Sequence, residues 1–276
     1  MNTESASPST ASPDPSTPFL LNGLVGDLFG TDHDRPTIVF LHGLTFSREI
    51  WGPSLDELRS LDPSRRVLAL DLPGHGESDP LMSYDMVSLT DRLHDVIHQS
   101  NLGPPVIVGH SVAAIIATVY AARFPTHGIV NVDQPLLTLP FAEMLHSMAD
   151  QLQSPAFGSI WPMIAQSFHT ELLPQRGQDL VRATSNPRQE IVLGYWQEVL
   201  EQSTADLASY IDSTMTAIRQ GEVPYLVIAG KDPEPDYVTW LQQSLPQATI
   251  VVLPDSGHFP HLRHPHRFAE VLLGFA

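Results

Sequence analysis

The fold is decided by the stretch VIVGHSVA (residues 106–113), which an apolar run over residues 114–122 follows. Its order is a β-branched strand, a sharp turn with small residues around Ser111, and then a helical pattern. This is the context in which a G-x-S-x-G motif exposes a serine nucleophile, and here Ala113 stands where glycine is usual. The first helical amide, that of Val112, would point at a developing oxyanion. Seen alone, Ser111 could equally be an ordinary serine in a tight turn, so the rest of the chain has to decide.

Five more β-branched, nearly continuous apolar runs accompany this strand, at residues 37–41, 67–71, 129–133, 225–229 and 249–253. Strands that are buried on both faces have this pattern, which favours a parallel sheet covered by helices. Helical stripes lie between the runs; one consists of Met86, Leu89, Leu93, Val96 and Ile97. The alternation predicts an α/β fold with a mostly parallel, doubly wound sheet.

One connection is too long for this rhythm. Residues 134–222 contain no convincing strand, only amphipathic stretches at 141–153, 189–201 and 207–219. A structureless loop of this length is uncommon, so we predict a helical cap insertion (134–222) over the carboxyl ends of the strands. The core then comprises residues 19–133 and 223–276. Residues 1–18 are rich in Ser, Thr and Pro and predict a disordered tail without the basic start of a signal peptide.

Composition excludes several classes of protein. The 276 residues include no cysteine, which removes disulfides, thiolate metal sites and a cysteine nucleophile. With 14 Lys+Arg against 31 Asp+Glu, the net charge of -17 would repel phosphate backbones and anionic lipids. No apolar stretch approaches the roughly 18 residues of a transmembrane helix. We therefore expect a cytoplasmic protein with no nucleic-acid or membrane partner, and we leave a homodimer open.

Two further motifs place polar groups at strand ends. His42-Gly43-Leu44 follows the strand at 37–41, where the amide of Gly43 or Leu44 could bind an oxyanion. The loop after the last strand contains His258, which could face Ser111 and act as its general base. The turn DLPGHGES (71–78) is interpreted as structural; its glycines form no phosphate loop, because no Lys-Ser/Thr follows them.

Four motifs, in this order, resemble those of the α/β-hydrolase superfamily: HG (42–43), DLPGHGES (71–78), GHSVA (109–113) and GHFPHLRHP (257–265). The resemblance runs from about residue 19 to the end and implies the α/β-hydrolase fold, a mostly parallel sheet of about eight strands with a cap. It implies Ser111 as nucleophile, His258 as general base, and an oxyanion hole from Val112 with Gly43 or Leu44. A serine at position 111 argues against the haloalkane dehalogenase and epoxide hydrolase branches, which use aspartate there.

The acid that would orient His258 has two candidates. Most family members have glycine, two residues and then aspartate after the strand at 225–229, whereas Gly230-Lys231-Asp232 places the aspartate one residue early. Asp133 ends the preceding strand, where some branches keep their acid, and its surroundings are weakly similar to the fungal resorcylic-lactone hydrolases. Many relatives have a purely structural aspartate at that position. We favour Asp133 because Lys231 could pair with Asp232, and Asp232 stays open.

Three other residues are candidates for substrate binding: His42, Tyr195 and Trp196. Aromatic residues on an amphipathic cap helix are more often packing residues, so that alternative stands beside the functional one. Thirteen histidines invite a metal-site hypothesis, but those after residue 257 follow the family pattern rather than ligand geometry. We expect neither a metal nor a cofactor.

The pattern and the resemblance together predict a serine hydrolase that cleaves a neutral, hydrophobic carboxylic ester or lactone through an acyl-enzyme. A small-molecule substrate is the expected partner. The same three residues could instead cleave a C–C, amide or thioester bond or support perhydrolysis. A non-catalytic receptor or binding protein of the same fold is also open.

Overall fold

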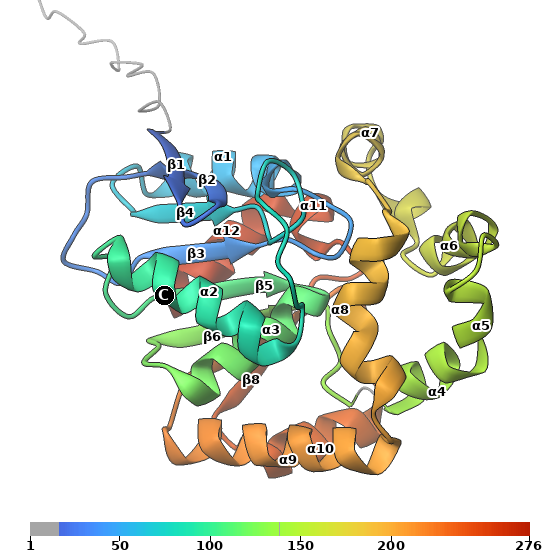
Figure 1. Cartoon of the computed structure of the whole chain (residues 1–276). Helices are drawn as coiled ribbons and strands as arrows, with labels where there is room; N and C mark the ends of the chain where they lie inside the picture. The colour runs from blue at the N-terminus through green and yellow to red at the C-terminus, as the bar shows by residue number, and fades with distance from the viewer. Residues whose placement is uncertain (1–16, 138) are drawn as a thin grey trace, which may run out of the picture.

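The computed structural model describes residues 17–137 and 139–276, and an eight-stranded sheet runs through its centre (Figure 1). The strands are β1 (Thr17–Leu21), β2 (Leu24–Phe29), β3 (Ile38–Leu41), β4 (Val67–Leu70), β5 (Val106–His110), β6 (Gly128–Val132), β7 (Tyr225–Ala229) and β8 (Ala248–Val252). Their spatial order is β1-β2-β4-β3-β5-β6-β7-β8. All pairs from β4 to β8 are parallel, which confirms the predicted mostly parallel sheet.

The antiparallel edge of the sheet corrects one prediction. β1 pairs with β2, and Thr17 and Pro18, expected to end a disordered tail, lie opposite Leu28 and Asp27. β2 pairs with β4 along one edge. Along its other edge, the backbone N–H and C=O groups of β2 find their hydrogen-bond partners in β1. Residues 1–16, the remainder of the predicted tail, lie outside the described residues.

Alternate side chains of the central strands enter two separate hydrophobic clusters. On β3, Val39 and Leu41 face one cluster while Ile38 and Phe40 face the other, and all four are fully buried. The first cluster is covered by α2 (Met86–Gln99), α3 (Val112–Arg123), α9 (Thr204–Gln220) and α10 (Pro235–Ser244). The second is covered by α1 (Gly52–Leu61) and α12 (Pro265–Phe275), which pack on each other. Burial on both faces explains why these strands are continuously apolar.

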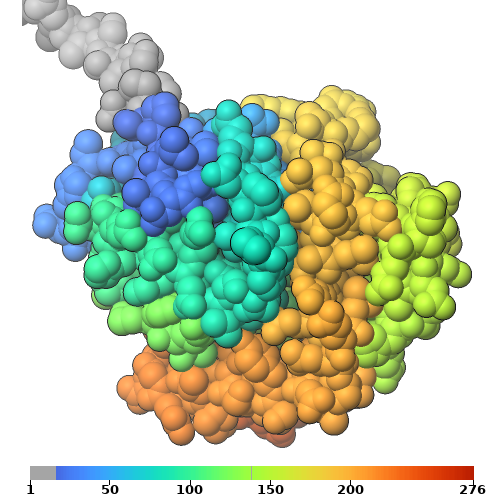
Figure 2. Space-filling model, in the orientation of Figure 1, coloured from blue at the N-terminus to red at the C-terminus, as the bar shows by residue number. Residues whose placement is uncertain are grey.

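The segment between β6 and β7 is helical. It contains α4 (Leu139–Ser147), α5 (Ala149–Leu152), α6 (Phe157–Gln166), the short 3-10 helix η2 (Thr170–Leu172), α7 (Gln175–Thr184), α8 (Gln189–Glu201) and α9. Helices α4 to α8 gather on one side of the sheet (Figure 1). α9 lies inside the range predicted as cap, yet it packs on α3 and runs beside α10, so it covers the sheet instead. In the space-filling view α8 lies between the core and the segment that contains α4 and α5 (Figure 2).

The sheet brings the candidate residues to one edge. Ser111 directly follows β5, Asp133 directly follows β6, Gly230 directly follows β7, and the loop after β8 contains His258. Since these four strands are parallel neighbours, their carboxyl ends meet at the same edge. This is where open α/β sheets hold ligands.

Candidate active site

Ser111 occupies a strained turn between β5 and α3. Its backbone has φ 56° and ψ -130°, a conformation that non-glycine residues adopt only where the surroundings enforce it. The Ser111 amide donates to the Val132 carbonyl at 3.0 Å, and the Ser111 carbonyl accepts from the Ala114 amide at 2.8 Å. A Cβ at Gly109 would clash with the Ala113 carbonyl, so the small residues flanking the serine are required by close backbone contact.

Asp133 contacts His258 directly. The Nδ1 of His258 lies 2.8 Å from Oδ2 of Asp133, and the other oxygen of Asp133 accepts from the Gly230 amide at 2.8 Å. Asp133 also has a positive φ of 54°, which turns it out of the line of β6. Asp232 is exposed and does not line the cavity that contains Ser111, Asp133 and His258. Among the described residues no ion pair joins Asp232 to Lys231, so the pairing that the sequence left possible is absent.

Two residues that sequence reasoning missed hold the His258 loop. The His258 amide donates to the Phe168 carbonyl at 3.0 Å, and the rings of the two residues stack with centroids 5.1 Å apart. On the other side, Nε2–H of His110 donates to the His258 carbonyl at 2.8 Å. Burial lowers the pKa of His110 well below its ordinary value, which favours the neutral ring with that proton. His110 stands in the serine motif itself, whereas Phe168 is one of several aromatic residues of the inserted segment and lies in no motif.

Backbone amides are available beside Ser111. Leu44 and Val112 line the cavity with Ser111, and neither amide donates to a described residue. The Val112 amide is free because the first turn of a helix has no internal acceptors. Gly43 does not line the cavity, but a Cβ there would lie 3.3 Å from Cβ of Ser111 and 2.8 Å from Nδ1 of His110. Only glycine therefore lets this loop approach the serine so closely.

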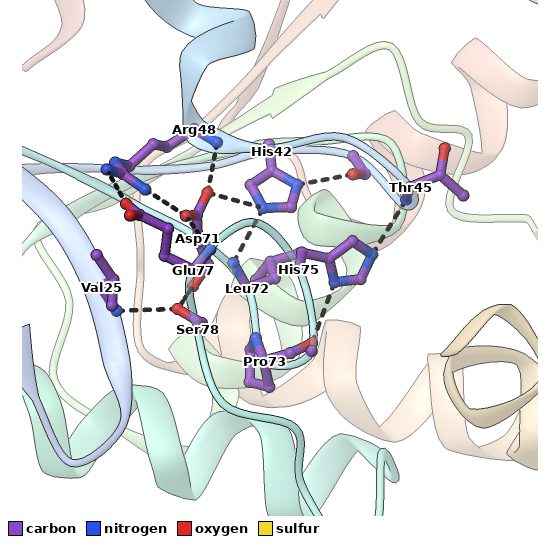
Figure 3. Close-up of polar contacts among 12 residues, drawn as sticks. Val25, His42, Thr45, Arg48, Asp71, Leu72, Pro73, His75, Glu77 and Ser78 are labelled. Carbon is purple, nitrogen blue, oxygen red and sulfur yellow. Dashed lines mark hydrogen bonds and ion pairs between the residues drawn. The ribbon is translucent and has the colours of Figure 1, made fainter. Parts of the chain in front are cut away.

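His42, a predicted substrate-binding residue, is fully buried and does not line the cavity. Both of its ring nitrogens bond backbone groups (Figure 3). Its Nδ1–H donates to the Gly43 carbonyl at 2.8 Å, and its Nε2 accepts from the Leu72 amide at 3.0 Å. The neighbouring His75 accepts from the Thr45 amide at 3.1 Å. Both imidazoles thus fix the loop that presents the Leu44 amide.

The turn at residues 71–78 anchors these imidazoles. The buried carboxylate of Asp71 accepts from the Arg48 amide at 2.7 Å, from the Glu77 amide at 3.0 Å and from the Arg48 guanidinium (Figure 3). Ser78 donates to the Asp71 carbonyl at 2.8 Å and accepts from the Val25 amide at 2.9 Å. The turn is therefore a fully bonded polar network that holds the loops of the site.

The cavity above Ser111 has a volume of about 1170 Å³ and is mainly apolar. Tyr195 and Trp196 both line it, but they also pack: the Tyr195 hydroxyl donates to the Pro73 carbonyl at 3.0 Å, and Trp196 packs against Phe141 and Trp161. Lys231 is the one Lys or Arg among its described lining residues. The volume is at or above the usual range for small-molecule sites.

The described residues contain no group of three or more His, Cys, Asp or Glu arranged to hold a metal ion. Within the same ranges, no helix is both long and apolar enough to cross a membrane.

Comparison with known proteins identifies the family of the chain. Over 255 residues the chain is 29% identical to 2-succinyl-6-hydroxy-2,4-cyclohexadiene-1-carboxylate synthase of Yersinia pseudotuberculosis, covering 88% of each chain. It is 28% identical to the sn-1-specific diacylglycerol lipase ABHD11 of Mus musculus, covering 90% of this chain and 83% of the lipase. Its fold is similar to that of an esterase from Exiguobacterium antarcticum, with a TM-score of 0.68, 17% identity, and coverage of 91% and 94%. Residues 38–271 match the alpha/beta hydrolase family, and the chain belongs to that family.

Proposed function

We propose that the protein is a serine hydrolase that cleaves a neutral, hydrophobic carboxylic ester or lactone through an acyl-enzyme. Ser111 is the nucleophile, His258 the general base, and Asp133 the acid that orients His258. The observation that carries the proposal is the 2.8 Å contact between His258 Nδ1 and Asp133, in the same cavity as a serine with a strained backbone. Asp133 is preferred over Asp232 because Asp232 is exposed and outside that cavity.

Each group has one role in the reaction. The Ser111 oxygen attacks the carbonyl carbon while Nε2 of His258 takes its proton, and Asp133 keeps the other ring proton on Nδ1. The amides of Leu44 and Val112 donate to the oxyanion of the tetrahedral intermediate. His258 then gives its proton to the departing alkoxide, and the acyl-enzyme forms. Water then attacks the acyl carbonyl while His258 takes one of its protons, and His258 gives that proton to the Ser111 oxygen as the acid is released.

The cavity supports a neutral, apolar substrate. Its lining is mainly apolar, and a net charge of -17 disfavours the approach of anions. The name of the synthase relative includes a carboxylate. In this chain, Lys231 is the one Lys or Arg among the described residues that line the cavity. Neutral esters should therefore be better substrates than esters that bear a carboxylate.

The test combines covalent labelling with turnover. A fluorophosphonate should label the wild-type protein at Ser111 alone, and Ser111→Ala should stay folded but lose about 10⁴-fold in kcat on p-nitrophenyl esters. Labelling without turnover would indicate a binding protein of the same fold. Labelling at another residue would refute the assignment of Ser111.

A further inference from the structure

One arm of the cavity runs along α3, away from the nucleophile. Ile115, Thr118 and Val119 line it, so one face of α3 forms its floor. Val119 is eight positions beyond Ser111, which corresponds to about 12 Å along the helix axis. Apolar side chains of α9, including Met215 and Ile211, line the same cavity. A long apolar group that starts at Ser111 could therefore extend along this arm.

The far part of this arm is polar. Glu198 lies in the last turn of α8, Gln202 directly follows that helix, and both line the cavity together with Tyr210 of α9. Glu198 is held by α2, because one of its carboxylate oxygens accepts from the Met86 amide at 2.8 Å. Val87, the next residue of α2, accepts at its carbonyl from the guanidinium of Arg123, the last residue of α3, at 3.1 Å. Glu198 thus lies beside the carboxyl-terminal end of α3, remote from Ser111.

Hydrogen-bonding capacity is left over in this cluster. Among the described residues, the second carboxylate oxygen of Glu198, the side-chain amide of Gln202 and the Tyr210 hydroxyl bond no partner. Burial is the main cause that raises the pKa of Glu198, and it also raises the pKa of Tyr210, to which the charge of Glu198 adds. A half-buried carboxylate with an unused oxygen is stabilised by any ligand that brings a donor to it.

We propose that Glu198, Gln202 and Tyr210 form a subsite for the hydrogen-bond-donating end, a hydroxyl or protonated amine, of a long apolar substrate group. This inference rests on the proposed function of Ser111. An extended chain advances about 3.4 Å for every three bonds, so about ten bonds separate the reacting carbonyl from the donor. The structural alternative is that Glu198 only caps the first amide of α2.

The kinetic test uses p-nitrophenyl esters of ω-aminodecanoic, ω-hydroxydecanoic and undecanoic acids, which have the same length and differ at the end. Wild type should have a higher kcat/KM for the two donor esters than for the methyl-terminated one. Glu198→Gln keeps an oxygen for the Met86 amide but removes the charge, so the amine-to-methyl ratio should fall about tenfold. Glu201→Gln, an exposed neighbour on α8 outside this cavity, is the matched control and should leave the ratio unchanged.

A binding test separates this inference from the hydrolase proposal. In Ser111→Ala, the fluorescence of the cavity-lining Trp161 and Trp196 should report tighter binding of methyl ω-aminodecanoate than of methyl undecanoate, and adding Glu198→Gln should remove the difference. Ester turnover that fails while this preference persists would refute the hydrolase and retain the subsite. Equal binding of the two methyl esters, or a ratio that Glu198→Gln leaves unchanged, would overturn the subsite.

Discussion

Four buried imidazoles should make this fold sensitive to mild acid. His42, His75, His110 and His261 are at most 5% exposed. Burial is the main cause that lowers the pKa of His42 to about 4, of His75 and His261 to about 3, and of His110 well below its ordinary value. In the unfolded chain each ring titrates near about 6.5. The folded state stays neutral where the unfolded state binds protons, so the unfolding free energy falls as the pH drops from about 6.5 towards 4.

The magnitude follows from proton linkage. Between pH 7.5 and 5.5, a ring that is neutral when folded and has an unfolded pKa of about 6.5 loses about 1.4 kcal/mol of stability. Four such rings amount to about 5 to 6 kcal/mol, comparable to the total stability of many domains. His266 opposes this slightly, because its exposed ring bonds Glu57 and has a raised pKa.

Urea titrations at a series of pH values measure this loss. The ring of His261 has no hydrogen-bond partner among the described residues, so His261→Leu removes one titrating group without breaking a side-chain hydrogen bond. It should reduce the loss between pH 7.5 and 5.5 by about 1.4 kcal/mol. His98→Gln, at an exposed position, should leave it unchanged. A stability that is flat from pH 7.5 to 5.5, or equal effects of the two variants, would refute the reasoning.

Three further changes test the site. Asp133→Asn should lower kcat about 10⁴-fold with nearly normal substrate binding, while Asp232→Asn loses far less; equal, small losses would mean that neither orients His258. Gly230→Ala should lower the melting temperature and kcat together, because its Cβ would clash with a neighbouring carbonyl of the His258 loop; a variant with wild-type values would contradict this contact. Trp196→Ala should impair bulky esters more than acetate esters in a kcat/KM series, and a uniform effect would make Trp196 a packing residue.

Local pattern was sufficient for the buried parallel strands but not for the antiparallel edge. Strands β3 to β7 are buried along their whole length and are mostly apolar because both faces are covered, and this composition marks them in the sequence. β1 (TPFLL) and β2 (LVGDLF) contain Pro, Gly and Asp and are only partly buried, so their pairing depends on each other. α6 contains Pro162, and no helix was predicted there.

The candidate site shows the same division. The position of Ser111 follows from its strand, turn and helix, all of which are local. The choice between Asp133 and Asp232 depends on which carboxylate faces His258, and two distant contacts favour Asp133: the ring itself and the Gly230 amide. The place of His42 outside the cavity could not be predicted, because its position beside Gly43 does not reveal that its ring points towards the end of β4.

The segment between β6 and β7 also holds His258 in place. The loop after β8 bonds the core through His110, and it contacts this segment through the Phe168 carbonyl and the stacked Phe168 ring. Gly257 has φ 53°, and a Cβ there would lie 2.7 Å from that same carbonyl, so the two segments are in backbone contact. Any motion of the segment between α6 and η2 must therefore either break these contacts or move His258 with it. The orientation of this imidazole thus depends on contacts with Phe168, in the segment between β6 and β7, as well as on Asp133.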